Sequence, residues 1–214
     1  RILMAIGVPY AKEYIQRFGF GADQIPSSLS MALGSGTATP MQMAEGYAVF
    51  ANGGYKVSNF VIDKIYDGNG QLRAQMQPLV AKQNAPQVID PRNAFIMYSM
   101  MRDVVRAGTA TRANALGRSD IAGKTGTTND NKDAWFVGFN PNLVSAVYIG
   151  FDKPRSMGRA AFGGTIALPV WVDYMRHALK GKPNVTMPVP GGIVQSGGEY
   201  FLREFPTTNP NLPL

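Results

Sequence analysis

The stretch Gly123-Lys124-Thr125-Gly126-Thr127-Thr128 gathers a cation, threonine hydroxyls and two glycines in consecutive residues. If this stretch is a β-strand, Thr125 and Thr127 project to one side and Lys124 to the other, while Gly126 leaves the backbone open to an extended ligand. The pattern therefore predicts a strand edge that binds an anion or a peptide. Taken alone, the same residues also fit a solvated edge strand.

A phosphate-binding loop is the obvious competing interpretation, because Gly-Lys-Thr also ends the pattern Gly-x-x-x-x-Gly-Lys-Ser/Thr. The spacing does not fit, since the nearest upstream glycine, Gly117, lies one residue too early. Residues 126–130 also begin with glycine and continue with polar turn formers where a phosphate loop requires a helix. The sequence therefore argues against a nucleotide site.

The composition predicts a folded chain. Its 214 residues are 45% hydrophobic and 16% charged, which is enough to bury a core as one domain or most of one. No run approaches about 18 apolar residues and no leader sequence opens the chain, so we expect neither a membrane span nor a signal peptide within it. Residues 1–7 have the pattern of a helix end closed by a glycine, from which we expect a piece of a longer polypeptide.

Charge and cysteine content narrow the function further. The net charge is +7, but the basic residues are scattered singly, which favours solvated faces over a nucleic-acid surface. The absence of cysteine excludes disulfides and thiolate metal sites. His177 is the only histidine and is expected on the surface, so neither a Ser-His-Asp triad nor a histidine metal site is predicted. We expect no metal and no cofactor.

Two helices are predicted in the first quarter of the chain. Pro9 begins a short amphipathic helix that Gly19 stops, and residues 22–38 form a polar Gly/Ser loop of the kind that often lines sites. Thr39 caps the next helix, where Gln42 completes a capping box. The stripe expected in the core consists of Met43, Ala44, Tyr47, Ala48 and Phe50.

The middle of the chain is predicted to hold a hairpin and a longer helix. Residues 57–66 and 71–76 flank the turn 67–70, which predicts a surface hairpin. Asp90 and Pro91 then signal the start of the helix. Its expected buried stripe, with methionines as core filler, consists of Ile96, Met97, Met100, Met101, Val104 and Val105.

Three strands are predicted next, at residues 121–127, 134–140 and 144–151. Short turns separate them, so they should be antiparallel neighbours, and their apolar character on both faces indicates a sheet covered on each side by helices. A helix introduced at residues 163–165 and ending at Gly181 is expected to pack on this sheet.

Two blocks of this sequence resemble one family. Residues 29–44 with 50–54, and residues 123–130 leading to 133–138, are similar to the signatures of class A, bifunctional penicillin-binding proteins. Lys-Thr-Gly is a signature motif of penicillin-binding proteins and active-site serine β-lactamases. The resemblance is closest to the 1a-type enzymes of Gram-negative bacteria. It makes residues 1–182 the C-terminal portion of a transpeptidase domain, followed by a Pro/Gly-rich irregular tail at residues 183–214.

The resemblance implies an α+β fold, the penicillin-binding and serine β-lactamase-like transpeptidase fold, with helices flanking a central antiparallel sheet. The implied reaction is acyl transfer: a serine attacks the penultimate D-alanine carbonyl of a peptidoglycan stem peptide, D-alanine leaves, and an amine of a second stem resolves the acyl-enzyme. The implied catalytic residues are Lys124, which supplies positive potential, and Thr127, whose N–H is an oxyanion donor. The implied substrate-binding residues are Thr125, Gly126 and Thr127, which hold the substrate carboxylate.

The sequence departs from the family pattern by lacking a nucleophile. No serine is followed three residues later by lysine, and no Ser-x-Asn is present. We therefore expect the missing N-terminal part of the same protein to supply both motifs, and the chain alone to be inactive. Two alternatives stay open: a non-catalytic peptidoglycan-binding or scaffold module on a degenerate transpeptidase fold, and a serine β-lactamase or D,D-carboxypeptidase.

The resemblance also implies partners and a location. The ligands would be stem peptides ending in D-Ala-D-Ala and β-lactams, with no nucleic acid among the partners. The protein would act on the periplasmic face of the bacterial inner membrane, anchored by a segment outside this chain.

Overall fold

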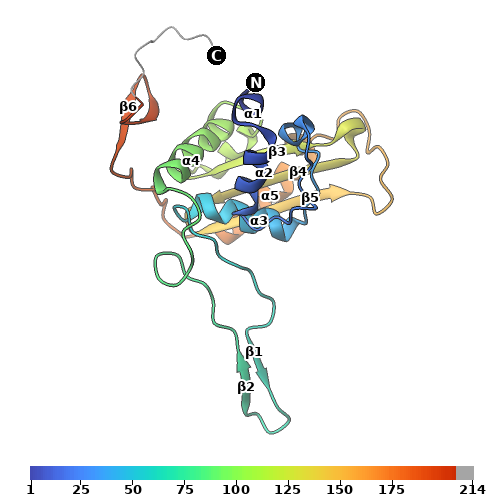
Figure 1. Ribbon diagram of the computed structural model, residues 1–214. Coiled ribbons are helices and arrows are strands. Elements are labelled where there is room, and N and C mark those ends of the chain that lie inside the picture. Colours follow the sequence, from blue (N-terminus) through green and yellow to red (C-terminus); the bar gives the residue numbers. More distant parts are fainter. Residues whose placement is uncertain (206–214) are drawn as a thin grey trace.

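A three-stranded antiparallel sheet forms the centre of the computed structural model, which describes residues 1–205 (Figure 1). β3 spans Ala122–Thr127, β4 spans Asp133–Asn140 and β5 spans Leu143–Gly150, in that order across the sheet. The register places Gly126 opposite Trp135, and Trp135 opposite Tyr148. The predicted strands are therefore confirmed, each to within one residue at either end.

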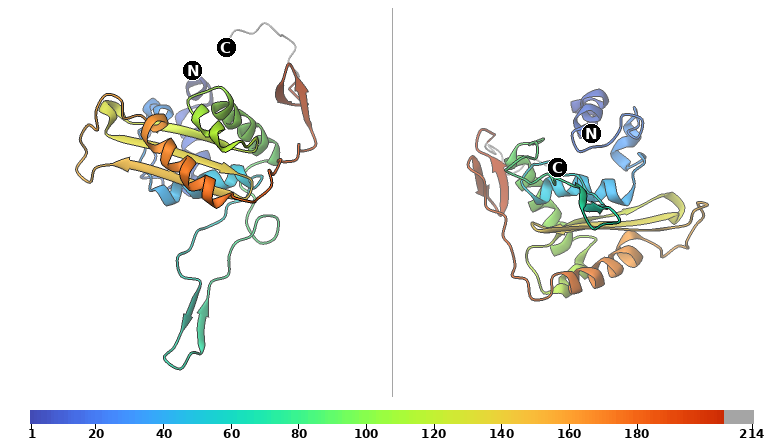
Figure 2. Two further views of the ribbon diagram at one scale, coloured as in Figure 1. Left: turned by 180° about the vertical axis from the view of Figure 1, so that it is seen from behind. Right: turned by 90° about the horizontal axis from the view of Figure 1, so that it is seen from below.

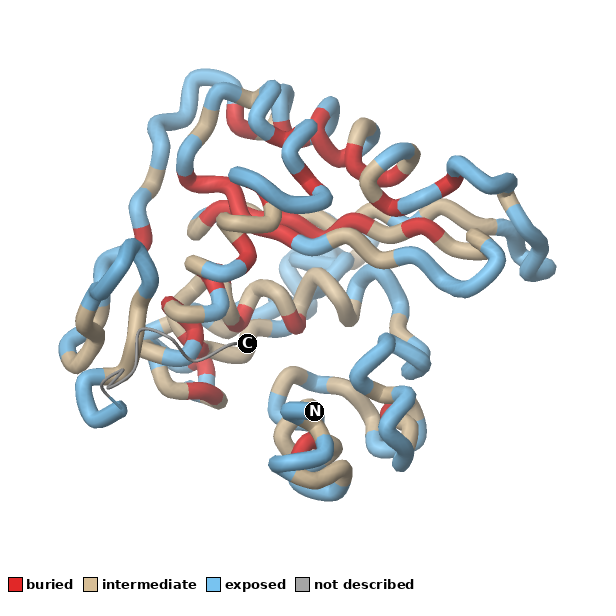
Figure 3. Tube along the Cα trace, turned by 90° about the horizontal axis from the view of Figure 1, so that it is seen from above, coloured by how far each residue is buried: buried red, intermediate tan, exposed pale blue. Residues whose placement is uncertain are grey.

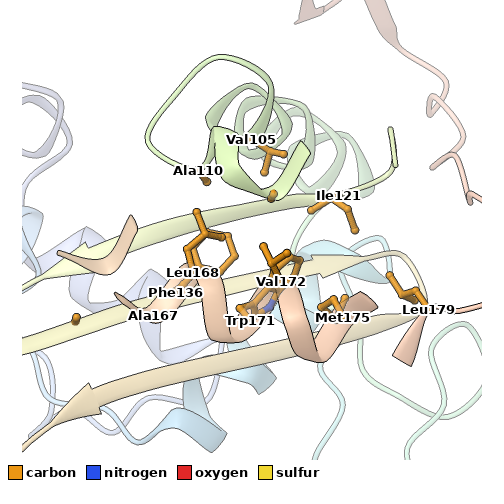
Figure 4. Packing of buried hydrophobic residues seen from close by; sticks show 12 residues of the cluster. Val105, Ala110, Ile121, Phe136, Ala167, Leu168, Trp171, Val172, Met175 and Leu179 are labelled. Atoms are coloured by element: carbon orange, nitrogen blue, oxygen red, sulfur yellow. The ribbon is translucent and has the colours of Figure 1, made fainter. Parts of the chain in front are cut away.

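The helix α5, Leu168–Ala178, covers one face of the sheet (Figure 2). The chain enters it through a π-helical turn, η4, at Gly163–Ala167. The ring of Trp171 is fully buried and packs edge-on against Phe136, with 5.0 Å between ring centroids, while its indole N–H donates to the Ser145 carbonyl at 3.1 Å (Figure 4). Because the ring is buried and its one polar group is paired, this contact fixes α5 on the sheet, as the sequence predicts.

The opposite face packs against α3 (Pro40–Ala51) and α4 (Pro91–Arg106). Phe139 of β4 is fully buried there, with its ring 6.0 Å from that of Tyr98 on α4 and 6.2 Å from that of Tyr47 on α3. Two 3₁₀ turns complete the connections: η2 at Thr111–Leu116 joins α4 to β3, and η3 at Asn129–Asn131 joins β3 to β4. The sheet therefore has helices on both faces, as its apolar strands indicate.

The predicted start of α3 is confirmed, but its buried face is rotated from the predicted stripe. The Thr39 hydroxyl accepts from the Gln42 N–H at 3.1 Å and the Gln42 side chain accepts from the Thr39 N–H at 3.0 Å, which completes the capping box. The predicted stripe, however, is only half-buried, whereas the fully buried positions are Gly46, Val49 and Ala51. Helical periodicity defines a stripe, but the neighbouring elements decide which part of it is sealed.

The stripe predicted for α4 is wrong in part. Met101 and Val105 are buried as expected, but Met97 and Met100 are 38% and 56% exposed. The buried face instead runs through the aromatic residues Phe95 and Tyr98. Aromatic rings bury the largest apolar areas, so they outweigh the methionines in setting the rotation of the helix.

The N-terminal segment, residues 1–38, lies against this body with few buried residues (Figure 3). It contains α1 (Ile2–Ile6), α2 (Val8–Gln16) and a 3₁₀ turn, η1 (Leu29–Leu33). The ring of Phe18 lies tilted against that of Phe50 on α3, 5.2 Å between centroids, and the side-chain amides of Gln24 and Gln42 exchange two hydrogen bonds of 3.1 and 3.0 Å. These contacts hold the loop of residues 22–38 beside the start of α3.

A hairpin projects from the body, as the sequence predicts (Figure 1). Its strands are shorter than expected, because β1 spans only Lys64–Tyr66 and β2 only Leu72–Gln75. All of their residues are exposed. A two-stranded ribbon with no face to bury is marginal in water, which explains why regular pairing stops early.

The prediction of an irregular tail after residue 182 is wrong for residues 193–202. There, β6 (Ile193–Ser196) and β7 (Glu199–Leu202) pair around Gly197 and Gly198, whose φ angles of 60° and 89° suit a type I′ turn. The Tyr200 ring packs edge-on against Phe95 of α4, 4.9 Å between centroids. Residues 206–214 lie outside the described part, so the remainder of that prediction and the domain boundary at residue 182 stay predictions.

Candidate active site

A cavity of about 680 Å³ lies between the loop of residues 24–39, the first turns of α3 and the sheet. Residues 124–127 of β3 and Thr128 directly after the strand form part of its wall, and β4 and β5 contribute aromatic residues. The Gly/Ser loop lines this site as its composition suggests. The Lys-Thr-Gly stretch is therefore the wall of a concave site and not an isolated surface strand.

The strand pleat separates the lysine from the threonines, as predicted. Lys124 pairs with Val137 in the register and Gly126 with Trp135, so these positions share the face toward the cavity. The Lys124 side chain is exposed, and its ammonium donates to the Thr125 carbonyl at 2.9 Å. Lys124 therefore places an exposed positive charge along the edge of β3.

The N–H groups of alternate residues in β3 point toward the unpaired edge of the strand. The Thr128 N–H donates to the Asp133 carbonyl on β4 at 3.0 Å. In an antiparallel ladder, residues alternate between those bonded to the neighbour and those facing away, so the N–H groups of Thr125 and Thr127 point to the outer edge. Within residues 1–205 no strand pairs with that edge. It is open to an added peptide strand.

The two threonine hydroxyls lie on the α5 side and have partners that the sequence did not indicate. The Thr125 hydroxyl lies 2.8 Å from that of Thr109, which follows α4, and the Thr127 hydroxyl accepts from the Gly163 N–H at 3.0 Å. An added Cβ at Gly163 would collide with the carbonyl oxygens of Trp135 and Gly126. No motif spacing connects residues 109 and 163 to the strand, because only the tertiary fold brings them there.

Aromatic residues and one carboxylate form the other end of the cavity wall. The rings of Trp135 and Tyr148 lie 4.7 Å apart between centroids, and the Tyr148 hydroxyl donates to Asp133 Oδ1 at 2.9 Å. This hydrogen bond to a carboxylate raises the pKa of Tyr148. Burial raises the pKa of Tyr47, which also lines the cavity, to about 12. Both phenols therefore stay neutral near pH 7.

The single histidine of the sequence lies away from this cavity. His177 is exposed on α5, its Nδ1 2.9 Å from the Asp173 carbonyl oxygen, and does not line the cavity. In the part of the chain that the structure describes, no group of three or more His, Cys, Asp or Glu side chains is placed to hold a metal ion. Nor is any helix within residues 1–205 long and apolar enough to cross a membrane.

An antiparallel sheet packed between helices, with a Lys-Thr-Gly-Thr strand at the wall of a cavity, defines the penicillin-interacting class of acyl-transfer folds. The family model described as the penicillin binding protein transpeptidase domain matches residues 2–176. The chain belongs to this family, which confirms the fold class predicted from the resemblance.

Individual relatives agree with this assignment. The chain is 71% identical over all of its 214 residues to penicillin-binding protein 1A of Neisseria lactamica, and 42% identical over 91% of its length to that of Pseudomonas aeruginosa. It spans only 27% and 29% of those relatives. The crystal structure of penicillin-binding protein 1A from Haemophilus influenzae superposes with a TM-score of 0.86 at 34% identity, covering 94% of this chain and 37% of that one.

Proposed function

We propose that this chain forms part of a D,D-transpeptidase that cross-links peptidoglycan stem peptides through a serine acyl-enzyme and is a target of β-lactams. The observation that carries the proposal is the open edge of β3, with the Thr127 N–H directed outward and the Lys124 ammonium beside it. A preformed oxyanion donor with a cation beside it stabilises the negative charge that develops on the carbonyl oxygen in acyl transfer.

The substrate would lie antiparallel to β3 along this edge. The Thr127 N–H would then bond the carbonyl oxygen of the penultimate D-alanine, where negative charge develops. Toward the start of β3, Lys124 and the hydroxyls of Thr125 and Thr127 would hold the C-terminal carboxylate, while Gly126 lets the peptide approach. Each hydroxyl already has a fixed partner, which orients it before substrate arrives.

The nucleophile would come from residues outside these 214. The sequence contains no serine three residues before a lysine and no Ser-x-Asn. A segment that also lies outside these 214 residues would anchor the protein on the periplasmic face of the inner membrane. Because the chain spans about a quarter of its relatives, the active centre would form only when the rest of the protein packs against the cavity.

The test uses the full-length protein that carries this chain, incubated with a peptide ending in D-Ala-D-Ala and with a free amine acceptor. D-alanine release together with an amine-linked product is expected. Release without the linked product, with water as the acceptor, would favour the β-lactamase or D,D-carboxypeptidase alternative. If the protein releases no D-alanine and is not covalently labelled by a fluorescent penicillin, the non-catalytic module is favoured. The 214-residue chain alone should remain unlabelled.

A further inference from the structure

The end of the cavity beyond Thr127 carries a carboxylate that the proposed reaction leaves unused. Asp133 is half-buried at the start of β4 and lines the cavity together with Trp135 and Tyr148. The register brings these three side chains to one face, because Asp133 and Trp135 are two residues apart on β4 and Tyr148 pairs directly with Trp135 on β5.

The charges along the cavity wall are divided between its two ends. Among the described residues that line it, Lys124 is the one basic and Asp133 the one acidic residue. Asp133 forms no ion pair within residues 1–205, and the Tyr148 hydroxyl occupies only its Oδ1. The second oxygen is free to accept another hydrogen bond, and a carboxylate beside aromatic faces attracts a cation.

A path leads from the open edge of β3 to this carboxylate. Gly126 lies directly opposite Trp135, and a Cβ added there would come within 3.2 Å of Trp135 Cβ. Because Gly126 has no side chain, a group bound along the edge can pass over β3 and reach the Trp135 ring. In the antiparallel orientation proposed above, the residues that precede D-Ala-D-Ala extend beyond Thr127, toward Thr128 and Asp133.

We propose that Asp133, Trp135 and Tyr148 form a subsite for the ammonium group of a stem-peptide side chain. The inference rests on the proposed function, in which every stem peptide carries an amine because it also serves as acceptor. The carboxylate pairs with the ammonium, the Trp135 ring covers the aliphatic part of the side chain, and the Tyr148 hydroxyl orients the carboxylate. The ammonium belongs either to the donor stem or to the acceptor stem, and the experiment separates the two.

The donor arm measures acylation of the full-length protein by two synthetic peptides. Both end in D-Ala-D-Ala and carry a preceding lysine, which is free in one peptide and Nε-acetylated in the other. If the subsite binds the donor, the wild-type protein prefers the free amine by about three- to tenfold, the size expected for a partly exposed ion pair with an aromatic contact. In Asp133→Asn the ratio of the acylation rate with the free-amine peptide to that with the acetylated peptide falls toward one. In Trp135→Leu the same ratio is reduced.

The acceptor arm measures the partition of a preformed acyl-enzyme between water and an added lysine-containing peptide. If the subsite binds the acceptor, Asp133→Asn shifts this partition toward water and leaves the donor ratio as in the wild-type protein. The matched control is Asp152→Asn, which removes a nearby exposed carboxylate that does not line the cavity. It should change neither ratio.

A purely structural role for Asp133 predicts a different result. Asp133 also ties β4 to Tyr148 of β5, so its replacement could loosen the sheet. Loosening slows reaction with both peptides equally and leaves the ratios unchanged, and unchanged ratios in both arms would overturn the subsite. No acylation of the wild-type protein by either peptide would instead overturn the proposed function itself.

Discussion

The hydroxyl oxygens of Thr109 and Thr125 lie 2.8 Å apart and join the turn after α4 to the strand that lines the cavity. Thr125 sits on β3, and Thr109 lies 16 residues earlier in the chain. If Thr109 donates to Thr125, the Thr125 proton is left to donate to a bound carboxylate. In that direction of donation, the pair orients the Thr125 hydroxyl toward a bound anion.

Replacing Thr109 should weaken binding of the substrate carboxylate. In the full-length protein, Thr109→Val removes the hydroxyl but keeps the shape, and we expect acylation by penicillin to slow by about tenfold, the cost of losing one well-placed hydrogen bond to a polar partner. Thr109→Ser should retain most of the rate, which is followed by fluorescent-penicillin labelling. Equal rates for the Val and Ser variants would show that the hydroxyl does not act through Thr125.

Replacing Lys124 should reduce acylation more severely. Lys124→Ala removes the only basic group among the described residues that line the cavity, and we expect the acylation rate to fall by on the order of a hundredfold. Lys132→Ala is the control, because Lys132 is paired with Asp130 at 3.3 Å and does not line the cavity. Wild-type acylation by Lys124→Ala would remove this residue from the site.

Replacing Gly163 should displace the strand. Since a Cβ at this position meets backbone oxygens of Trp135 and Gly126, Gly163→Ala forces η4 away from β3. Overpacking of this kind costs about 1–3 kcal/mol of unfolding free energy. Gly158→Ala is a partial control, because no atom lies within 4 Å of its added Cβ, although its φ of 104° itself strains alanine. A fully active, fully stable Gly163→Ala protein would contradict the packing described for η4.

Replacing Asp120 should destabilise the fold. Asp120 is buried, and its carboxylate accepts from the Arg118 guanidinium at 2.6 and 2.9 Å, from the Val185 N–H at 2.9 Å and from Asn140 at 3.2 Å. Asp120→Asn leaves the Arg118 guanidinium, whose side chain is only 10% exposed, without its counter-charge and should cost about 3 kcal/mol in unfolding free energy. Asp173→Asn, at an exposed ion pair, should cost far less. Equal losses for the two variants would contradict the role of burial.

The same carboxylate should contribute to acid unfolding. Burial acts to raise the pKa of Asp120, but the hydrogen bonds from Arg118, Val185 and Asn140 outweigh it and hold the pKa below its ordinary 3.8. The folded state therefore binds this proton less readily than the unfolded chain, so the stabilisation is complete above pH 3.8 and is lost as the pH falls through the lower native pKa. When the unfolding free energy is measured against pH, Asp120→Asn should show a smaller loss below pH 3.8 than the wild-type protein. The same loss in both proteins would contradict the prediction.

The sequence by itself determined the local structure and the family. Thr39, Gln42, Asp90 and the short turns act over a few residues, so their caps and strand boundaries follow from nearest neighbours and are confirmed. The Gly197-Gly198 turn was also readable as a type I′ signal, but the prolines around it pointed to irregular structure.

Only the tertiary structure decided which faces are buried and which distant residues meet. The rotation of α4 follows from the packing of Phe95 and Tyr98 against other elements, which helical periodicity cannot specify. Contacts of Thr109 with Thr125, and of Gly163 with Thr127, join segments far apart in the chain. Side-chain spacing along one strand fixes which groups share a face, but burial and long-range hydrogen bonds depend on the summed packing of the whole fold. From the sequence alone the Lys-Thr-Gly strand could have been a solvated edge, and the packing of the fold places it in the wall of a cavity.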